Sequence, residues 1–269
     1  MANCALMRAL FVGDVVGPRA VAWLAERLPA LRGEHRADLV VVDAENCAAD
    51  GASMSVAGVE TLLAAGADVV TGGNHAFEGS EMQAVLDHPR VLRPLNVGED
   101  VPGRGALTLA LDGNGNGEEV RVVVLADRLA LADAPPFAHM TLAPYAAWAA
   151  LPAGPSTIVE MHALSVATKQ ALAYALDGEV AAVLGTHTHE PTIALRVLPR
   201  GTALVTEVGM TGVRESLQGM DPQAFVRHAR GLPASELAPV RPAEDGEIVL
   251  GAVLLEIEDG VTRTVTRVR

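Results

Sequence analysis

Hydrophobic positions along the chain gather in short runs that are apolar on both faces of a strand. Such runs, bounded by polar or glycine residues, are typical of strands that are covered on both sides. The runs are residues 5–12, 39–42, 69–71, 156–159 and 181–184. Between them apolar residues recur at helical spacing, in residues 21–31, 56–65, 81–86 and 165–176. Strands that alternate with helices predict right-handed crossovers and a largely parallel sheet.

The second half of the chain adds strands of a different kind. Residues 106–111 and 120–125 flank the glycine-rich residues 112–117, which predicts a hairpin, and residues 126–140 are expected to form an irregular loop. Further strands are predicted at residues 193–198, 203–205, 248–257 and 261–268. The total predicts two mixed sheets packed face to face with helices outside, a four-layer α/β/β/α sandwich. We find no linker, so we expect a single domain over residues 1–269.

Composition and charge narrow the classes of function. The chain has 269 residues and a formal net charge of -13, so broad binding to nucleic acid, which needs a basic surface, is not expected. Two cysteines indicate no disulfide framework. We expect no signal peptide and no membrane span, hence a cytoplasmic protein, and a homo-oligomer. The single lysine, Lys169, we attribute to genomic base composition rather than to chemistry.

Potential metal ligands follow five of the predicted strands. The carboxyl ends of strands gather ligands in open α/β sheets, so side chains distant in sequence are expected to meet there. A mixed set of oxygen and nitrogen donors suits Mn, Fe or Zn and does not suit a thiolate site. The candidates, in chain order, are Asp14, Glu45, Asn46, Asn74, His75, Glu160, His162, His187 and His189.

Each candidate taken alone also has a structural explanation. Asp14 fits a cap of the helix that begins near Pro18, and Glu45-Asn46 fits an ordinary polar loop. Asn74-His75 fits a turn, and an isolated buried histidine such as His162 is more often a hydrogen-bonded core residue. His187 and His189 are the stronger signal, because alternate residues of an extended segment face the same side. We interpret His35, His88, His139 and His228, which lack this placement, as surface or packing residues.

These segments together resemble the metallophosphoesterase superfamily, and within it the YmdB-like branch of bacterial cyclic-nucleotide phosphodiesterases. The resemblance runs in order from about Arg8 to near the C-terminus, and includes residues 92–96, 208–212 and 219–221. The motifs that carry it are Gly13-Asp14, Glu45-Asn46, Gly73-Asn74-His75, Met161-His162 and Gly185-Thr186-His187-Thr188-His189.

The resemblance implies two divalent metal ions, Fe or Mn first and Zn second. One ion would be held by Asp14, Glu45, Asn46 and His189, and the other by Glu45, Asn74, His162 and His187. Glu45 would bridge the pair, a hydroxide between the ions would attack phosphorus, and His75 would protonate the leaving oxygen.

The chain also departs from the patterns it resembles. Val16 and Glu45 stand where the wider superfamily has His and Asp, which is how the YmdB-like branch differs from it. Within the branch, Asp43, residues 76–78 and Glu190 are unusual, and we expect Phe77, Glu78 and Glu190 at the rim of the pocket. None of these changes removes an implied ligand.

The predicted function is hydrolysis of cyclic nucleotides, 2',3'-cyclic first and 3',5'-cyclic second. Two alternatives stay open: a phosphomonoesterase or nucleotidase with the same metals, and a regulatory protein that binds a nucleotide without hydrolysis. The small phosphorylated substrate would be recognised with little base stacking, because aromatic residues are only 3% of the chain. Phe77 and Phe137 are the candidates for that contact.

Overall fold

Strand β1 (Met7–Val12) shows how one buried strand contributes to two cores at once. The computed structural model describes residues 6–111, 118–154, 156–233 and 239–268. Successive side chains of a strand point to opposite faces of its sheet. Leu10 and Val12 therefore pack in the core beneath the helices, while Met7, Ala9 and Phe11 pack between the two sheets.

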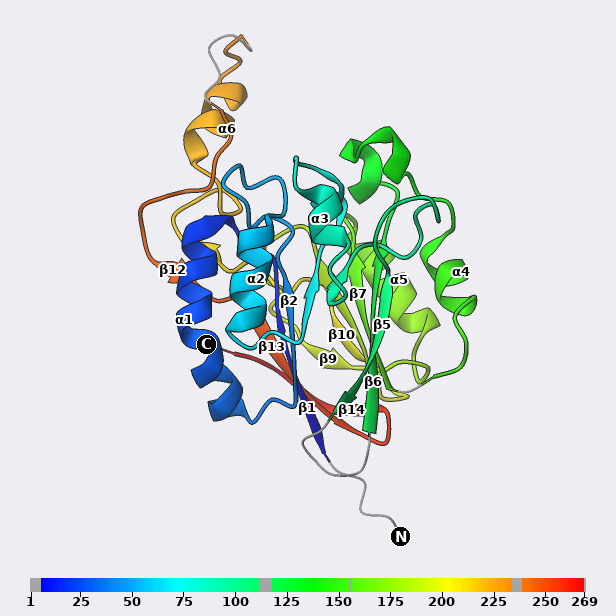
Figure 1. Cartoon of the computed structure of the whole chain (residues 1–269). Helices are drawn as coiled ribbons and strands as arrows, with labels where there is room; N and C mark the ends of the chain where they lie inside the picture. The colour runs from blue at the N-terminus through cyan, green and yellow to red at the C-terminus, as the bar shows by residue number, and fades with distance from the viewer. Residues whose placement is uncertain (1–5, 112–117, 155, 234–238, 269) are drawn as a thin grey trace.

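The first sheet has six strands in the order β14-β13-β1-β2-β3-β4 (Figure 1). Strands β1 to β4 run parallel, and β13 and β14 add an antiparallel edge from the end of the chain. The bounds besides those of β1 are β2 (Leu39–Asp43), β3 (Val69–Thr71), β4 (Val91–Leu92), β13 (Ala252–Glu258) and β14 (Val261–Arg267).

The second sheet also has six strands, in the order β5-β6-β7-β8-β10-β9. The pairs from β6 to β10 are parallel, and β5 and β9 pair antiparallel at the two edges. The bounds are β5 (Ala106–Leu111), β6 (Glu118–Ala126), β7 (Ser156–His162), β8 (Ala182–Thr186), β9 (Arg196–Val197) and β10 (Ala203–Val205).

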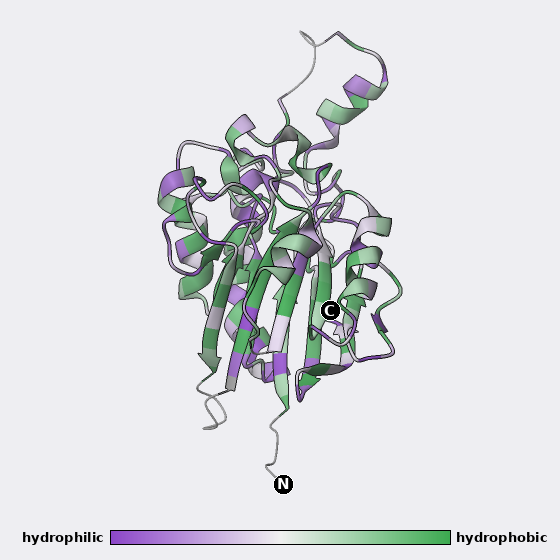
Figure 2. Cartoon of the chain, turned by 90° about the vertical axis from the view of Figure 1, so that its right-hand side faces the viewer, coloured by the Kyte–Doolittle hydropathy of each residue, from purple (hydrophilic) through white to green (hydrophobic). Residues whose placement is uncertain are grey.

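Helices cover the outer face of each sheet, and the predicted α/β/β/α sandwich is thereby confirmed (Figure 1). Helices α1 (Gly17–His35), α2 (Val56–Ala64) and α3 (Met82–Leu86) pack on the first sheet. Helices α4 (Pro144–Ala149) and α5 (Val166–Ala175) pack on the second sheet. The strands between these layers are mostly apolar (Figure 2). Among the described residues, no helix combines the length and apolar character needed to cross a bilayer.

Local sequence signals account for where these helices begin. The Ser55 hydroxyl accepts the backbone N–H of Gly58 at 3.1 Å and caps α2, and the Ser165 hydroxyl does the same for Thr168 at the start of α5, at 3.3 Å. Helix α1 instead begins with Gly17 at φ +78° followed by Pro18. Among the described residues, short 3₁₀ helices lie in the loops at η1 (Asn74–Phe77), η3 (Ala130–Asp133) and η4 (Pro136–Ala138).

Several predicted elements differ in the structure. The strand expected at residues 248–257 is two strands, because β12 (Ile248–Val249) leaves the first sheet and pairs with β11 (Gly212–Val213). Only Arg196 and Val197 of residues 193–198 form a strand. Helix α6 (Pro222–Ala229), which projects from the body in Figure 1, and helix α4 were not predicted. The hairpin pairing of β5 with β6 is confirmed, while its turn lies outside the described residues.

The inter-sheet core generates a stability prediction. Phe11 is 1% exposed between the two sheets. Replacing a buried Phe by Ala removes apolar contacts and leaves a cavity, so Phe11→Ala should lower the free energy of unfolding by about 3–5 kcal/mol. The matched control is Phe137→Ala, whose side chain is 48% exposed, with an expected change within about 0.5 kcal/mol. Urea unfolding measures both, and equal effects would contradict the assignment of the core.

Candidate metal centre

Both sheets direct the carboxyl ends of their parallel strands to the same end of the molecule. Strands β1 and β2 end just before Asp14 and Glu45, and β8 ends just before His187. The two sets of ends touch, because the backbone N–H of His187 donates to Asp14 Oδ1 at 3.2 Å. The strand ends therefore bring together two residues that are 173 positions apart in the sequence.

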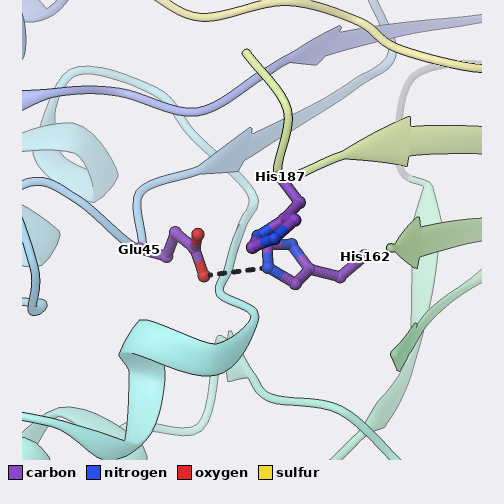
Figure 3. A group of neighbouring side chains, drawn as sticks. All are labelled: Glu45, His162 and His187. Carbon is purple, nitrogen blue, oxygen red and sulfur yellow. Dashed lines mark ion pairs between the residues drawn. The ribbon is translucent and has the colours of Figure 1, made fainter. Parts of the chain in front are cut away.

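Five of the predicted ligands form two groups that share one carboxylate. Asp14, Glu45 and His189 each offer a ligand atom within 4.8 Å of the others, and so do Glu45, His162 and His187. In Figure 3 the Glu45 carboxylate, on the loop after β2, faces the two imidazoles from the ends of β7 and β8. Glu45 thus lies where the resemblance implies a bridging residue.

The two predicted asparagine ligands lie against these groups. Asn74 Oδ1 is 2.9 Å from His162 Nε2. Asn46 donates from Nδ2 to the Gly51 carbonyl at 2.7 Å, so the amide oxygen of Asn46 faces away from Gly51. Within the described residues, Asn46 Oδ1 and Asp14 Oδ2 are buried side-chain oxygens with no hydrogen-bond partner. A buried oxygen without a donor is costly, and a cation satisfies it.

The Glu45 carboxylate is held by backbone groups of the loop after β3. Its Oε2 accepts the N–H of Gly73 at 2.8 Å and of His75 at 3.3 Å. Gly73 is needed there because a Cβ at this position would lie 2.2 Å from the His162 ring. The Gly-Gly sequence before Asn74 thus lets the loop donate to Glu45 while His162 packs directly on its backbone.

Hydrogen bonds fix which nitrogen of His162 and His189 carries a proton. Thr186 donates its hydroxyl to Glu160 Oε1 at 2.9 Å, so its oxygen accepts from His162 Nδ1 at 3.0 Å. The Gln218 carbonyl accepts from His189 Nδ1 at 2.8 Å. In the neutral form of each ring the lone pair is therefore on Nε2.

Both Nε2 atoms face oxygen acceptors. His162 Nε2 is 3.4 Å from Glu45 Oε2, and His189 Nε2 is 3.6 Å from Asp14 Oδ1. Burial lowers the pKa of His162 well below its usual value, so this imidazole is neutral and supplies no positive charge to the acids. Histidines that bind metals have this arrangement, with the other nitrogen donating to a carbonyl or polar group. The contacts suit a cation between each imidazole and its carboxylate.

Carboxyl groups are concentrated in this centre. Burial raises the pKa of Asp14 to about 6 and that of Glu160 to about 7. The pKa values of Asp43 and Glu45 are also raised well above their usual range, first by burial and then by neighbouring carboxylates. Burial lowers the pKa of His187 to about 4. The carboxyl groups resist ionisation because they are buried. A divalent cation in this centre would favour their ionised forms and balance their negative charge.

The structure decides between several of the alternatives for single residues. Asp14 is not a helix cap, because the N-cap of α1 is Val16 and no side chain caps it. Glu160 and His162 lie within β7, rather than after it as predicted, since β7 pairs with β6 and β8 through His162. Phe77 is a core residue at 2% exposure, so the prediction that it lies at the pocket rim or stacks on a base is wrong.

Asp43 is a member of the centre to which the sequence analysis gave no role. One of its carboxylate oxygens lies within 4.8 Å of ligand atoms of Asp14 and His162. Its Oδ1 accepts the backbone N–H of Glu45 at 3.0 Å. The sequence signal for Asp43 was its position as the one charged residue, at the end of the otherwise apolar strand β2. Glu160, a strand-end candidate without an implied role, holds Thr186 and through it His162.

His75 lies beside the centre and in neither of the two groups. Its Nδ1 is 2.9 Å from Glu78 Oε1, and its side chain is about a quarter exposed. The carboxylate leaves Nε2 as the nitrogen that a bound molecule can approach. Glu78 thus orients this imidazole as a carboxylate orients a catalytic histidine.

Comparison with known proteins agrees with the motifs. A family model described as YmdB-like protein matches residues 10–268. The chain belongs to the YmdB-like family. The resemblance seen in the sequence is thereby confirmed over nearly the whole chain.

Three relatives of this YmdB-like chain are similar to it over nearly their full lengths. It is 33% identical to the 2',3'-cyclic-nucleotide 2'-phosphodiesterase of Bacillus subtilis (strain 168), covering 96% of this chain and 94% of the relative. The crystal structure of a hypothetical protein from Thermus thermophilus has a TM-score of 0.84 at 35% identity, with 97% of each chain covered. That of a novel phosphatase from Mycoplasma pneumoniae has a TM-score of 0.86 at 27% identity, with 99% and 94% covered.

The charge of the centre predicts how metal affinity depends on pH. Asp14 must lose its proton before it can bind an ion, and its pKa is about 6. The imidazole of His187 is already neutral there, since its pKa is about 4. Affinity for Mn²⁺ should therefore rise as pH increases through about 6, and binding should release protons. Calorimetric titration in buffers of different ionisation enthalpy measures both, and affinity that falls over this range would contradict the prediction.

Proposed function

We propose that this YmdB-like chain is a metal-dependent phosphodiesterase that hydrolyses cyclic nucleotides. The relatives support an enzyme of the phosphoesterase class. The observation that carries the metal chemistry is the pair of imidazoles, His162 and His189, whose Nε2 lone pairs face Glu45 and Asp14. We take 2',3'-cyclic nucleotides as the first substrates, as in the Bacillus subtilis relative, and 3',5'-cyclic nucleotides as the second.

We assign two divalent ions to the two groups of side chains. The donor set is carboxylate, amide and imidazole, which suits Fe or Mn first and Zn second. Buried oxygens of Asp14 and Asn46 without a hydrogen-bond partner in the described chain support the assignment. The first ion would be held by Asp14, Glu45, Asn46 and His189, and the second by Glu45, Asn74, His162 and His187.

Bound ions of this kind supply a nucleophilic water at neutral pH and offset the charge of the phosphate. The residues of the chain do the rest. Neutral asparagine and histidine donors leave more of the positive charge for the phosphate than further carboxylates would. Glu45, fixed by the N–H groups of Gly73 and His75, holds its position between the two groups.

We propose His75 as the proton donor to the leaving oxygen. Protonated at both nitrogens, its imidazolium donates from Nδ1 to Glu78 Oε1, and the Nε2–H is the proton delivered. The contact with Glu78 keeps the ring from rotating. The partial exposure of His75 lets a substrate reach it.

A phosphomonoesterase is the second candidate, because the related Mycoplasma pneumoniae structure is described as a phosphatase. The same metal groups would serve both reactions. Turnover of 2',3'-cyclic, 3',5'-cyclic and open nucleoside monophosphates, measured with one Mn²⁺-loaded sample, separates the two. We expect the highest kcat/KM for a cyclic diester; a higher value for the monoesters would overturn the diesterase assignment in favour of the second candidate.

Location and assembly are the remaining parts of the proposal. We place the enzyme in the cytoplasm, since Cys47 is a free buried thiol and a reducing compartment keeps thiols in this state. The expected homo-oligomer stays a prediction.

The proton-donor role predicts that His75→Ala keeps its metal and loses turnover. General acid catalysis contributes about 10²–10⁴-fold, so kcat should fall by that factor while bound metal, measured by elemental analysis, is unchanged. His35→Ala, at the far end of α1, is the matched control and should keep full activity. Glu45→Gln should show the opposite pattern, losing metal first. Normal turnover by His75→Ala would remove the proton donor from the proposal.

A further inference from the structure

The one lysine of the chain is buried next to the metal centre without belonging to it. Lys169 lies in α5 at 0% exposure, and its Nζ is 2.8 Å from Oε2 of Glu207, which is itself 3% exposed. A buried ion pair adds little stability on its own, because removing two charges from water costs about as much as their attraction returns. The role of the pair is therefore sought in the other residues that Lys169 and Glu207 contact.

Glu207 binds the residue between two predicted metal ligands. Its Oε2 accepts the backbone N–H of Thr188 at 3.0 Å and the Thr188 hydroxyl at 2.5 Å. Its Oε1 accepts the N–H of Gly209 at 3.2 Å. The remaining polar group of Thr188, its carbonyl, accepts from Gln218 Nε2 at 3.1 Å. Thr188 is thus held through its backbone N–H, its hydroxyl and its carbonyl.

The backbone on both sides of Thr188 is strained. His187 has φ +93° and His189 has φ +63°, in the left-handed region that residues other than glycine rarely adopt. Such conformations cost free energy and persist only where surrounding contacts enforce them. The bonds from Glu207 to Thr188 are contacts of that kind, and they lie at the centre of the strained segment.

The fold makes room for the lysine at a glycine of the same motif. A Cβ at Gly185 would lie 2.7 Å from Lys169 Cδ and 2.2 Å from the Thr206 carbonyl oxygen. Gly185 therefore lets the lysine stem pass across β8 to reach Glu207. The first residue of the Gly-Thr-His-Thr-His motif is therefore a glycine for two reasons: the Thr206 backbone and the lysine stem both lie where a Cβ would be.

We propose that the Lys169–Glu207 pair is a positioning device, which holds Thr188 so that His187 and His189 both face the metal centre. The inference rests on the proposed function, because it takes these histidines as metal ligands. Lys169 orients Glu207, Glu207 orients Thr188, and the strained backbone turns the two rings inward. Neither charged residue belongs to the groups of side chains that could hold an ion.

The test measures Mn²⁺ affinity rather than activity, by electron paramagnetic resonance of free Mn²⁺ during titration. The decisive variant is Lys169→Met with Glu207→Leu, which removes both charges of the pair together, so neither is left buried without the other. We expect affinity to fall by about 10–100-fold, the usual effect of removing residues that orient metal ligands. A folded double variant with the wild-type affinity would overturn the proposal.

Two further variants decide the matter if the double variant does not fold. Thr188→Ala removes only the hydroxyl bond and should weaken Mn²⁺ binding by about 10-fold, while Thr188→Ser keeps that bond and should bind as the wild type does. Unchanged affinity in Thr188→Ala would then overturn the proposal.

A matched control separates positioning from general stability. Asp177 is another buried carboxylate, just after α5, and it accepts the backbone N–H groups of Arg200 and Thr202 at the opposite end of β8. Asp177→Asn should lower the melting temperature and leave Mn²⁺ affinity unchanged; an equal loss of affinity would make the effect merely structural and overturn the proposal. A wild-type chain that binds no Mn²⁺ would instead refute the proposed function itself.

Discussion

The crowding of buried carboxyl groups at one end of the two sheets is the constraint on which the site depends. Asp14, Asp43, Glu45 and Glu160 are each at most 1% exposed. In a medium of low polarity their mutual repulsion and loss of hydration are large. Backbone N–H groups of the loops donate to the Glu45 carboxylate and hold it in place. The neighbouring imidazoles of His162 and His187 are neutral, so each has a lone pair that could bind a cation. A divalent cation would balance the charge that these carboxyl groups carry once they ionise.

The sequence was most informative where a buried strand ended in a polar residue. Strands β1, β2 and β8 are apolar nearly throughout, so Asp14, Glu45 and His187 stood out among the polar groups after them. The rule that strand ends share one edge then predicted that these residues meet. Asp43 was missed because it belongs to the strand itself, where a charged residue looked like a departure from the motif.

Elements defined by distant contacts were beyond local patterns. Residues 248–257 have a continuous strand pattern, yet Gly251 lies so close to Gly209 that a Cβ there would be 2.2 Å from its carbonyl oxygen, and the strand is interrupted there. Phe77 looked like a rim residue since it follows His75, but the 3₁₀ turn at Asn74–Phe77 directs it into the core. Register and turn geometry of this kind depend on contacts that no short window contains.

Each of the two groups takes ligand atoms from both sheets. Glu45 comes from the first sheet, and His162 and His187 come from the second; Asp14 and His189 likewise stand on opposite sides. An ion bound in either group would therefore link the two sheets by polar bonds at one end, while the core between the sheets is apolar. Because a folded half alone would present an incomplete set of donors, high-affinity binding would begin only once the halves had docked, so metal capture would mark the completion of folding.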